Sequence, residues 1–310
     1  MNFFNVPFLV LIFCFVATVP AAAPHNLFNL SNVDFSDHEE EGSVITMQET
    51  TPTIINKSDL YGSFSNFHLL SLHIQNSQLS SYNFLRAGLA NACIEKSTLN
   101  GSTFQETEMP TSKLFDSSFN HCIFSRANLF EVEIDNHCNF TKASFLKSDI
   151  SFGSIKNSTV EGATFTKCDF LRSTIQTVNF TNASFIDCRF SRTHLKNLDF
   201  SHTIMHNPRF FKATLTNVTF AHSTTLQHAD FRKSKLLHVN FDEVDLRNTR
   251  FTGVHILEGT SFKNAKIDAT TEATPKEIVK LVKLGAIIIP HENQAETPHH
   301  AKRVRYGIFP

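Results

Sequence analysis

The chain of 310 residues carries 28 Lys and Arg against 29 Asp and Glu, and its formal net charge of -1 indicates neither a surface for polyanions nor an acidic mimic of one. Phe occurs 32 times, whereas Tyr occurs 3 times and Trp is absent. This skew indicates one side chain in one repeated structural role, and it favours a single repetitive body over two ordinary domains.

Residues 1–23 predict a signal peptide. They contain no charged side chain, and an apolar run over residues 8–19 is followed by Pro20 and three alanines. Such a run ending in small residues is typical of a secretory signal, here with cleavage before Ala22. The alternative is an uncleaved anchor over residues 3–23, which approach the roughly 20 residues that cross a bilayer. We therefore expect a secreted or periplasmic protein, or one that residues 3–23 anchor in a membrane.

Residues 24–63 are polar and acidic, with Asp and Glu far outnumbering the single Lys57. Such a composition favours a poorly ordered linker. The segment contains no recognisable cap for the fold that follows it.

An apolar residue then recurs at every fifth position from Phe64. The series continues to Ile267, with single added residues that shift the frame to Phe140, Leu226 and Phe262. The position two before each apolar centre is nearly always Ala, Ser, Thr, Cys, Gly or Val. A period of five fits neither an α-helix, at 3.6 residues per turn, nor a flat strand, at 2.0. The repeat therefore predicts a solenoid, in which stacked units share one core.

Three segments show the motif most clearly: Ala127-Asn128-Leu129, Ala163-Thr164-Phe165 and Ala229-Asp230-Phe231. They resemble the pentapeptide-repeat family, whose motif is A(D/N)LXX. The resemblance implies an all-β, right-handed quadrilateral β-helix over residues 64–268, with one pentapeptide on each side and about ten coils of about 20 residues.

A longer period of four pentapeptides is also visible, because centres at that spacing fall into columns of like residues. One column is a Phe ladder and another is aliphatic, as four-sided coils predict. The Phe ladder consists of Phe64, Phe84, Phe104, Phe124, Phe145, Phe165 and Phe185. The aliphatic ladder consists of Ile74, Ile94, Leu114, Ile134, Ile155, Ile175, Leu195, Leu215, Leu236 and Ile256.

Residues 269–289 predict a C-terminal cap. Thr274 and Glu277 form a capping-box pattern with Pro275 at the first helical position, and Gly285 follows the apolar stretch. This predicts a helix over residues 275–284 that covers the last coil. Residues 286–289 are either a strand or part of the lid, and residues 290–310 are a flexible tail.

Five cysteines follow the predicted signal peptide, and an odd number does not indicate a disulfide framework. Four of them occupy the small inward position, where we interpret them as core filler, and Cys93 is expected to point outward. Cys168 and Cys188 fall in adjacent coils at a spacing near 4.8 Å, which is within the Cα range of a possible disulfide.

No residue is predicted to be catalytic, to bind a cofactor or to bind a metal. Motifs of hydrolases, kinases, zinc proteases and dinucleotide-binding proteins are absent from the sequence. The His121-Cys122 and His137-Cys138 pairs cannot converge on one ion, because inward cysteines and outward histidines point apart. His202, His222 and Glu243 stack at one corner, where solvated surface residues are the simpler interpretation. We therefore expect a protein that is not an enzyme.

Three functions remain open. The first is an exported protein-protein interaction module or scaffold with an unidentified protein partner. The second follows from the resemblance, because some pentapeptide-repeat proteins mimic duplex DNA and bind topoisomerases such as gyrase. Such mimicry needs a strongly negative rod, whereas 21 Lys and Arg against 18 Asp and Glu give residues 64–268 a charge of +3. The third is a structural rod that self-associates through its uncapped N-terminal coil. Nucleic acid is not expected as a partner, and membrane contact is expected only if residues 1–23 stay attached.

Overall fold

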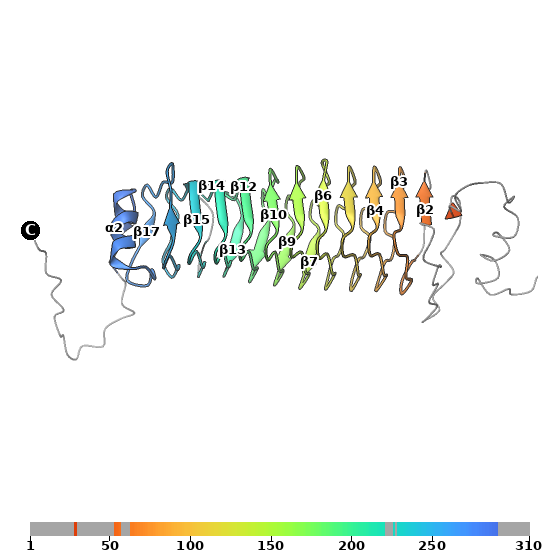
Figure 1. The fold of residues 1–310 in the computed structure, drawn as a ribbon, viewed down its shortest axis with the longest axis horizontal. Coiled ribbons are helices and arrows are strands. Elements are labelled where there is room, and N and C mark those ends of the chain that lie inside the picture. Colours follow the sequence, from red (N-terminus) through yellow and green to blue (C-terminus); the bar gives the residue numbers. More distant parts are fainter. Residues whose placement is uncertain (1–27, 30–52, 57–62, 221–225, 227, 291–310) are drawn as a thin grey trace, which may run out of the picture.

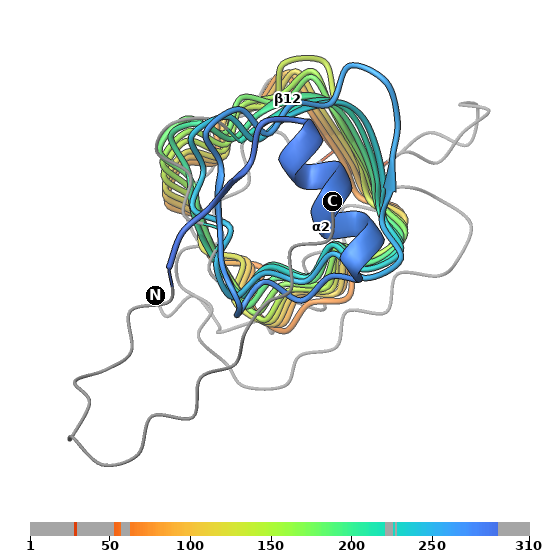
Figure 2. The same cartoon turned by 90° about the vertical axis from the view of Figure 1, so that its left-hand side faces the viewer.

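The described chain is a rod of stacked coils, closed at one end by a helix (Figure 1). The structure is a computed structural model, and it describes residues 28–29, 53–56, 63–220, 226 and 228–290. It confirms the predicted fold class, because the coils form a parallel β-solenoid of about ten turns. Viewed along the axis, the coils superpose as a four-sided tube, with the helix α2 (Pro275–Lys283) lying across its end (Figure 2).

Short strands line two sides of the rod, and every pairing between them is parallel. The longer sheet has the order β1 (Phe28–Asn29), β2 (Thr53–Asn56), β3 (His73–Gln75), β4 (Cys93–Glu95), β5 (Lys113–Phe115), β6 (Glu133–Asp135), β8 (Ser154–Lys156), β10 (Thr174–Gln176), β12 (His194–Asp199), β14 (Thr214–Thr219), β15 (Lys235–Asn240) and β16 (His255–Ile256). The second contains β7 (Ser144–Leu146), β9 (Thr164–Thr166), β11 (Ser184–Ile186) and β13 (Ile204–His206). Isolated bridges, such as Ser63 to Asn83, continue the pairing on the other sides.

The aliphatic ladder is confirmed in full. Each of its members is the register partner of the next, from Ile74 opposite Ile94 to Leu236 opposite Ile256. All of its side chains are buried. The longer period in the sequence, four pentapeptides, is therefore the length of one coil.

A left-handed corner explains why each side has five residues. Two residues after a centre the backbone has a positive φ, for example 61° at Asn66 and 57° at Ser71. One residue later the small residue donates its N–H back to the carbonyl of the centre, as Ala87 does to Phe84 at 3.0 Å. A short extended stretch then carries the next centre inward. Asn and Gly tolerate the left-handed region best, which explains why Asn is the commonest residue at the corners of the described chain.

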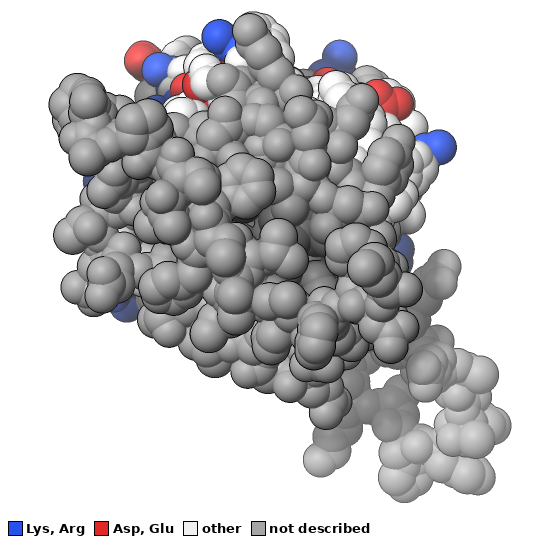
Figure 3. Space-filling view, turned by 90° about the vertical axis from the view of Figure 1, so that its right-hand side faces the viewer, with Lys and Arg blue, Asp and Glu red and all other residues white. Residues whose placement is uncertain are grey.

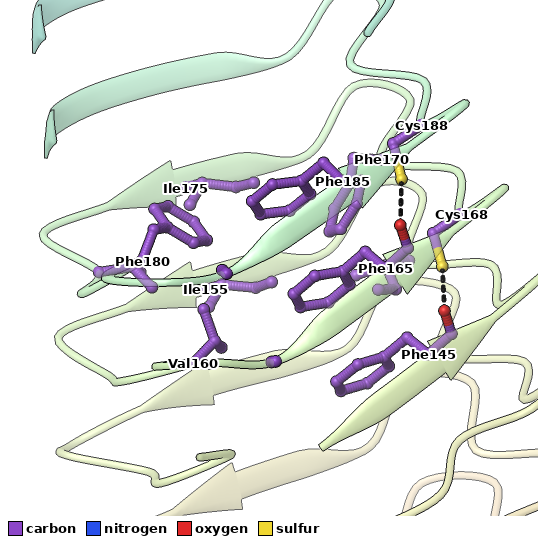
Figure 4. Packing of buried hydrophobic residues seen from close by; sticks show 14 of the residues in the cluster. Phe145, Ile155, Val160, Phe165, Cys168, Phe170, Ile175, Phe180, Phe185 and Cys188 are labelled. Carbon is purple, nitrogen blue, oxygen red and sulfur yellow. Dashed lines mark hydrogen bonds between the residues drawn. The ribbon is translucent and has the colours of Figure 1, made fainter. Parts of the chain in front are cut away.

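The predicted Phe ladder is a file of stacked rings in the bore (Figure 4). From Phe84 to Phe185 successive ring centroids lie 4.6–4.8 Å apart, and the planes differ by no more than 10°. This separation equals the spacing of hydrogen-bonded strands, so ring stacking and backbone pairing are satisfied together. The first pair is tilted by 41° at 5.8 Å. Tyr82 occupies a position that is small in most repeats, and its ring contacts both Phe64 and Phe84.

The C-terminal half contains two further Phe files on opposite sides of the bore. One consists of Phe170, Phe190, Phe210, Phe231 and Phe251. The other consists of Phe180, Phe200, Phe220, Phe241 and Phe262. Rings of the two files meet edge to face, as Phe231 and Phe241 do at 5.4 Å and 89°. The bore is therefore filled by facing aromatic files after the first ladder passes to Met205.

Two of the three added residues are absorbed at corners. Asn136 and His137 adopt positive φ values of 54° and 63° in succession, so the extra residue lengthens the corner and leaves the next centre facing inward. At the third site Gly259 has a φ of 67°, and a Cβ there would lie 1.8 Å from Nδ1 of His238. The second site, at residues 221–225, lies outside the described residues.

The C-terminal cap is confirmed, with the helix ending one residue before the predicted end. The Thr274 hydroxyl accepts the N–H of Glu277, and the Glu277 carboxylate accepts the N–H of Thr274 at 2.7 Å, which completes the capping box. Leu281 is fully buried against the last coil. Beyond α2, the strand β18 (Ile287–Ile288) pairs with β17 (Lys266–Ile267) and so continues the solenoid. Residues 291–310, most of the predicted tail, lie outside the described residues.

The prediction that residues 24–63 form a poorly ordered linker is wrong for β1 and β2. The strand β2 pairs with β3, and Ile55 lies opposite Ile74 with its side chain fully buried. Paired centres in neighbouring coils are otherwise at least four pentapeptides apart in the sequence, whereas Ile55 and Ile74 are one residue closer. A search of the sequence at the fixed period therefore does not find Ile55. The sheet therefore begins before Phe64. The predicted signal peptide, residues 1–23, lies outside the described residues.

The Phe ladder can be tested by truncation. Phe124 is fully buried and stacks at 4.7 Å on the rings of both neighbouring coils. Phe124→Ala should lower the free energy of unfolding, measured by urea denaturation, by about 3–5 kcal/mol, because it leaves a cavity between two rings. The control Phe152→Ala removes a ring that is 41% exposed and should cost less than about 1 kcal/mol. Equal costs for the two variants would contradict a stacked ladder.

Candidate functional site

The four cysteines at small positions are structural, because their thiols hydrogen-bond within the core. Cys168 donates to the carbonyl oxygen of Phe145, and Cys188 donates to that of Phe165, each at 3.2 Å (Figure 4). Ser102 and Thr107 make the same bond to the coil before them, each at 2.9 Å. Where the small residue is Ser, Thr or Cys, it can therefore also bond to a carbonyl of the preceding coil.

The possible disulfide between Cys168 and Cys188 is not formed in the structure, where both are free thiols. Their side chains make the same bond one coil apart, so the sulfur atoms are offset by about 4.8 Å, whereas a disulfide needs about 2 Å. The neighbouring Cys168 thiol, together with burial, raises the pKa of Cys188. Burial raises the pKa of the Cys122 thiol to about 12, so it stays protonated and unreactive near neutral pH.

The histidine and cysteine pairs do not make a metal site. His121 is exposed while Cys122 is buried, and the same holds for His137 and Cys138. Within the described parts of the chain, no three His, Cys, Asp or Glu residues are grouped as metal ligands would be. His222, of the predicted corner triplet, lies outside the described residues. No helix of the described chain combines the length and the apolar character that a membrane span needs.

A shallow pocket on the outside of the rod gathers charged side chains from successive coils. Its volume is about 380 Å³. It lies on the side of the rod whose interior carries the file from Phe170 to Phe251. The residues that line it are Asp187, Asn207, Arg209, His228, Asp230, Arg232 and Arg250.

Hydrogen bonds neutralise most of the charges in this pocket. The Arg232 guanidinium binds both carboxylate oxygens of Asp230, at 2.9 and 2.7 Å. Burial acts to raise the pKa of Asp230, but the hydrogen bonds from Arg232 outweigh it, so the pKa is below its usual range. Arg250 pairs with Glu272 at 2.7 Å, and Asp187 accepts a hydrogen bond from Asn207 at 2.9 Å. A carboxylate held as an anion in this way is a poor general base.

Arg209 differs from its neighbours in the pocket. It is exposed, and within the described residues it makes no ion pair. It belongs to a column in which each residue bridges to the next coil: Asp149, Asp169, Arg189, Arg209, Asp230, Arg250 and Glu272. Arg189 pairs with Asp169 at 3.3 Å, which leaves Arg209 as the available cation of the column.

The repeat pattern alone places Asp149, Asp169 and Asp230 at the surface position before an apolar centre. It does not identify the arginines that stack with them. The whole column can be found in the sequence by comparing the residue before a centre with the residue one coil, or about 20 residues, later. The charges that meet lie in adjacent coils and not within one pentapeptide. Because cations already bind its carboxylates, the column is unsuited to acid-base chemistry. Its exposed charges can instead recognise charged groups of another molecule.

A match to a protein-family model agrees with this architecture. Residues 173–251 match the family model described as a pentapeptide repeat region. This part of the chain is a pentapeptide repeat region. The described coils before and after it have the same register and the same left-handed corners, as the pentapeptide-repeat resemblance implied.

Solved pentapeptide repeat structures are distant in sequence. HetL, a pentapeptide repeat protein involved in heterocyst differentiation regulation from the cyanobacterium Nostoc, is 15% identical over 85% of this chain and 97% of its own, with a TM-score of 0.33. QnrB1, a plasmid-mediated fluoroquinolone resistance protein, is 17% identical over 72% of this chain and 97% of its own, with a TM-score of 0.35. No curated protein matches the chain.

Thiol reactivity tests the buried cysteines. In the folded protein, alkylation at about pH 8 should label the half-buried Cys93 first, because burial raises the pKa of Cys122 to about 12 and hides its sulfur. Mass mapping after limited alkylation measures this order, and labelling in denaturant is the control. A peptide that links Cys168 to Cys188 after mild oxidation would contradict the core assignment.

The Asp230–Arg232 pair predicts a pH dependence of stability. Arg232→Met should lower the free energy of unfolding by about 1 kcal/mol at pH 7, with allowance for partial exposure of the pair. The pKa of Asp230 is lowered in the folded state, so the stabilisation is present above its unfolded pKa of about 3.9 and is lost as the pH falls through the folded pKa. Urea denaturation at about pH 7 and pH 2 measures the difference, with Asp230→Asn as the partner variant. The same cost at both pH values would contradict this ion pair.

Proposed function

We propose that the chain is a non-enzymatic, exported interaction module that binds another protein through the outer sides of its rod. The observation that carries this proposal is the column of charges over successive coils, which presents side chains at fixed intervals on a rigid surface. The pocket on that side holds ion-paired carboxylates, which suits recognition rather than acid-base chemistry. Export is supported by the apolar run and the small residues within 1–23.

The alternative of a DNA-mimicking topoisomerase-binding protein has less support. A mimic of duplex DNA requires dense negative charge along its length. Residues 166–268 instead carry 14 Lys and Arg against 9 Asp and Glu, a net +5. Both signs are also visible among the described residues in the view from the N-terminal end of the rod (Figure 3). Inhibition of DNA supercoiling by the purified chain would restore this alternative.

Self-association of the rod through an open N-terminal coil also has less support. The prediction rested on a bare edge at Phe64, but β2 pairs with β3 and β1 pairs with β2. At the other end, α2 covers the last coil. The edges of β3 and of the last coil are therefore occupied, and β1 is the outermost strand at the N-terminal end of the described sheet.

Fractionation with N-terminal sequencing tests export. We expect the chain in the exported fraction of its source cells, beginning at Ala22 because the cleavage site precedes it. An intact N-terminus in the membrane fraction would indicate the anchor instead. Recovery from the cytoplasm would contradict export.

Cross-linking tests the interaction. In the compartment where the full chain is found, chemical cross-linking and mass spectrometry should identify one protein partner in constant stoichiometry. Arg209→Glu should weaken its recovery at least about tenfold, since it reverses the available cation of the charged column. Lys113→Glu, on a different side, is the control. A chain that remains an uncross-linked monomer would contradict the proposal.

A further inference from the structure

One corner of the C-terminal half carries a cation in each of four successive coils. We call it the basic corner, and it consists of Arg172, Arg192, Lys212 and Lys233. Each follows a buried Phe of the same file by two residues, and ring centroids in that file lie 4.8, 5.1 and 4.8 Å apart. The four cations therefore project from a straight edge at intervals of about 5 Å.

The stability of the rod does not explain these four cations. Like charges directly opposite one another in paired strands are destabilising. All four side chains are exposed, and each sits at a left-handed φ of 58° to 60°, where Asn or Gly is favoured. In the described part of the chain none of them pairs with a carboxylate.

Another corner neutralises itself over three coils, before the cations Lys147 and Lys167 follow at the same corner. There Arg86, Glu106 and Arg126 alternate in sign, and Glu106 accepts hydrogen bonds from the two arginines at 2.9 and 3.1 Å. These bonds lower the pKa of Glu106 and keep it ionised. The basic corner has no such acidic residue between its cations, so no carboxylate at this corner neutralises them.

Two of the cations, Arg172 and Lys212, lie against aromatic rings. The Arg172 guanidinium carbon lies 5.4 Å from the ring centre of Phe152, which precedes it at the same corner and is 41% exposed. The Lys212 ammonium lies 5.3 Å from the ring centre of Phe211. Cation–π contact restricts these long side chains without neutralising them. Exposed aromatic rings beside cations are typical of protein interaction sites.

We propose that the basic corner binds an acidic α-helix of a protein partner, with one carboxylate per helical turn facing each cation. This inference rests on the proposed function and names the chemistry of the partner. A helix rises 5.4 Å per turn, so over three intervals of about 5 Å it drifts by only about 1–2 Å, within the reach of Arg and Lys side chains. An extended strand repeats a face every 6.6–6.8 Å and drifts by roughly 5 Å.

The surroundings of the basic corner favour a protein over a nucleic acid. Asp187 and Asp230 lie on the same side of the rod, in the pocket that also holds Arg209. Carboxylates in the path of a uniform polyanion repel it, whereas a protein surface with both signs can complement both. Single-stranded DNA is therefore the comparison ligand in the test.

The test measures binding of the full chain to two synthetic helical peptides of identical composition. In the first, glutamates at i, i+4, i+7 and i+11 lie on one face, and in the second they are spread around the helix. A hydrocarbon staple holds both peptides helical. By fluorescence anisotropy at low salt, the one-faced peptide should bind at least about tenfold tighter, and its affinity should fall as salt is added.

Charge reversal locates the site. Arg192→Glu combined with Lys212→Glu should weaken binding of the one-faced peptide at least about thirtyfold. Lys147→Glu combined with Lys167→Glu makes the same charge change at another corner and should alter binding less than about twofold. All four residues are exposed, and circular dichroism checks that both variants fold.

Three results would overturn the proposal: equal binding of the two peptides, equal losses in the two double variants, or tighter binding of single-stranded DNA of the same charge.

Cross-linking of the Arg192→Glu, Lys212→Glu variant separates this proposal from the proposed function. Loss of the partner supports both. Retention of the partner overturns the basic corner as its site and leaves the interaction module intact, whereas absence of a partner even for the wild-type chain removes the proposed function.

Discussion

Parallel hydrogen bonding between coils, at one fixed spacing, is the constraint from which the other features follow. Each coil donates to and accepts from its neighbours along the rod, and the rings of the Phe ladder from Phe84 to Phe185 stack at 4.6–4.8 Å because the backbones do. A small residue beside each centre leaves room for the ring. Where that residue has a hydroxyl or thiol group, as at Ser102 and Cys188, it adds a bond to a carbonyl of the preceding coil. Packing and hydrogen bonding therefore impose the same period.

The same constraint organises the outer surface into columns. Any exposed position recurs one coil later beside an equivalent position, so its charge is either neutralised or reinforced by its neighbours. The Arg86, Glu106 and Arg126 column is neutralised, while the basic corner is reinforced. This difference separates a surface that stabilises the rod from one suited to a partner, although every residue involved is an ordinary exposed side chain.

Most of the fold could be predicted from the sequence, because inward positions repeat strictly enough to be counted. The sequence predicts both the aliphatic ladder, from Ile74 to Ile256, and the Phe ladder, from Phe64 to Phe185, with the members that the structure stacks. The capping box at Thr274 also predicts the position of α2. Ile55 was missed because its spacing departs from the period by one residue. The candidate site was not found, since a single pentapeptide does not reveal which charges meet across coils. That information lies in the three-dimensional register. Arg209 is available because Arg189 pairs with Asp169 and Asp230 pairs with Arg232.

The change from one Phe file to two gives the rod an energetic gradient along its axis. Coils near Phe84 and Phe104 are joined by a single stacked file, whereas those near Phe231 and Phe241 are joined by two files that also meet edge to face, beneath a docked helix. In a linear array the weakest interfaces open first. Unfolding should therefore begin at the amino-terminal coils and proceed toward the helix, so the two ends of the rod differ in their resistance to unfolding.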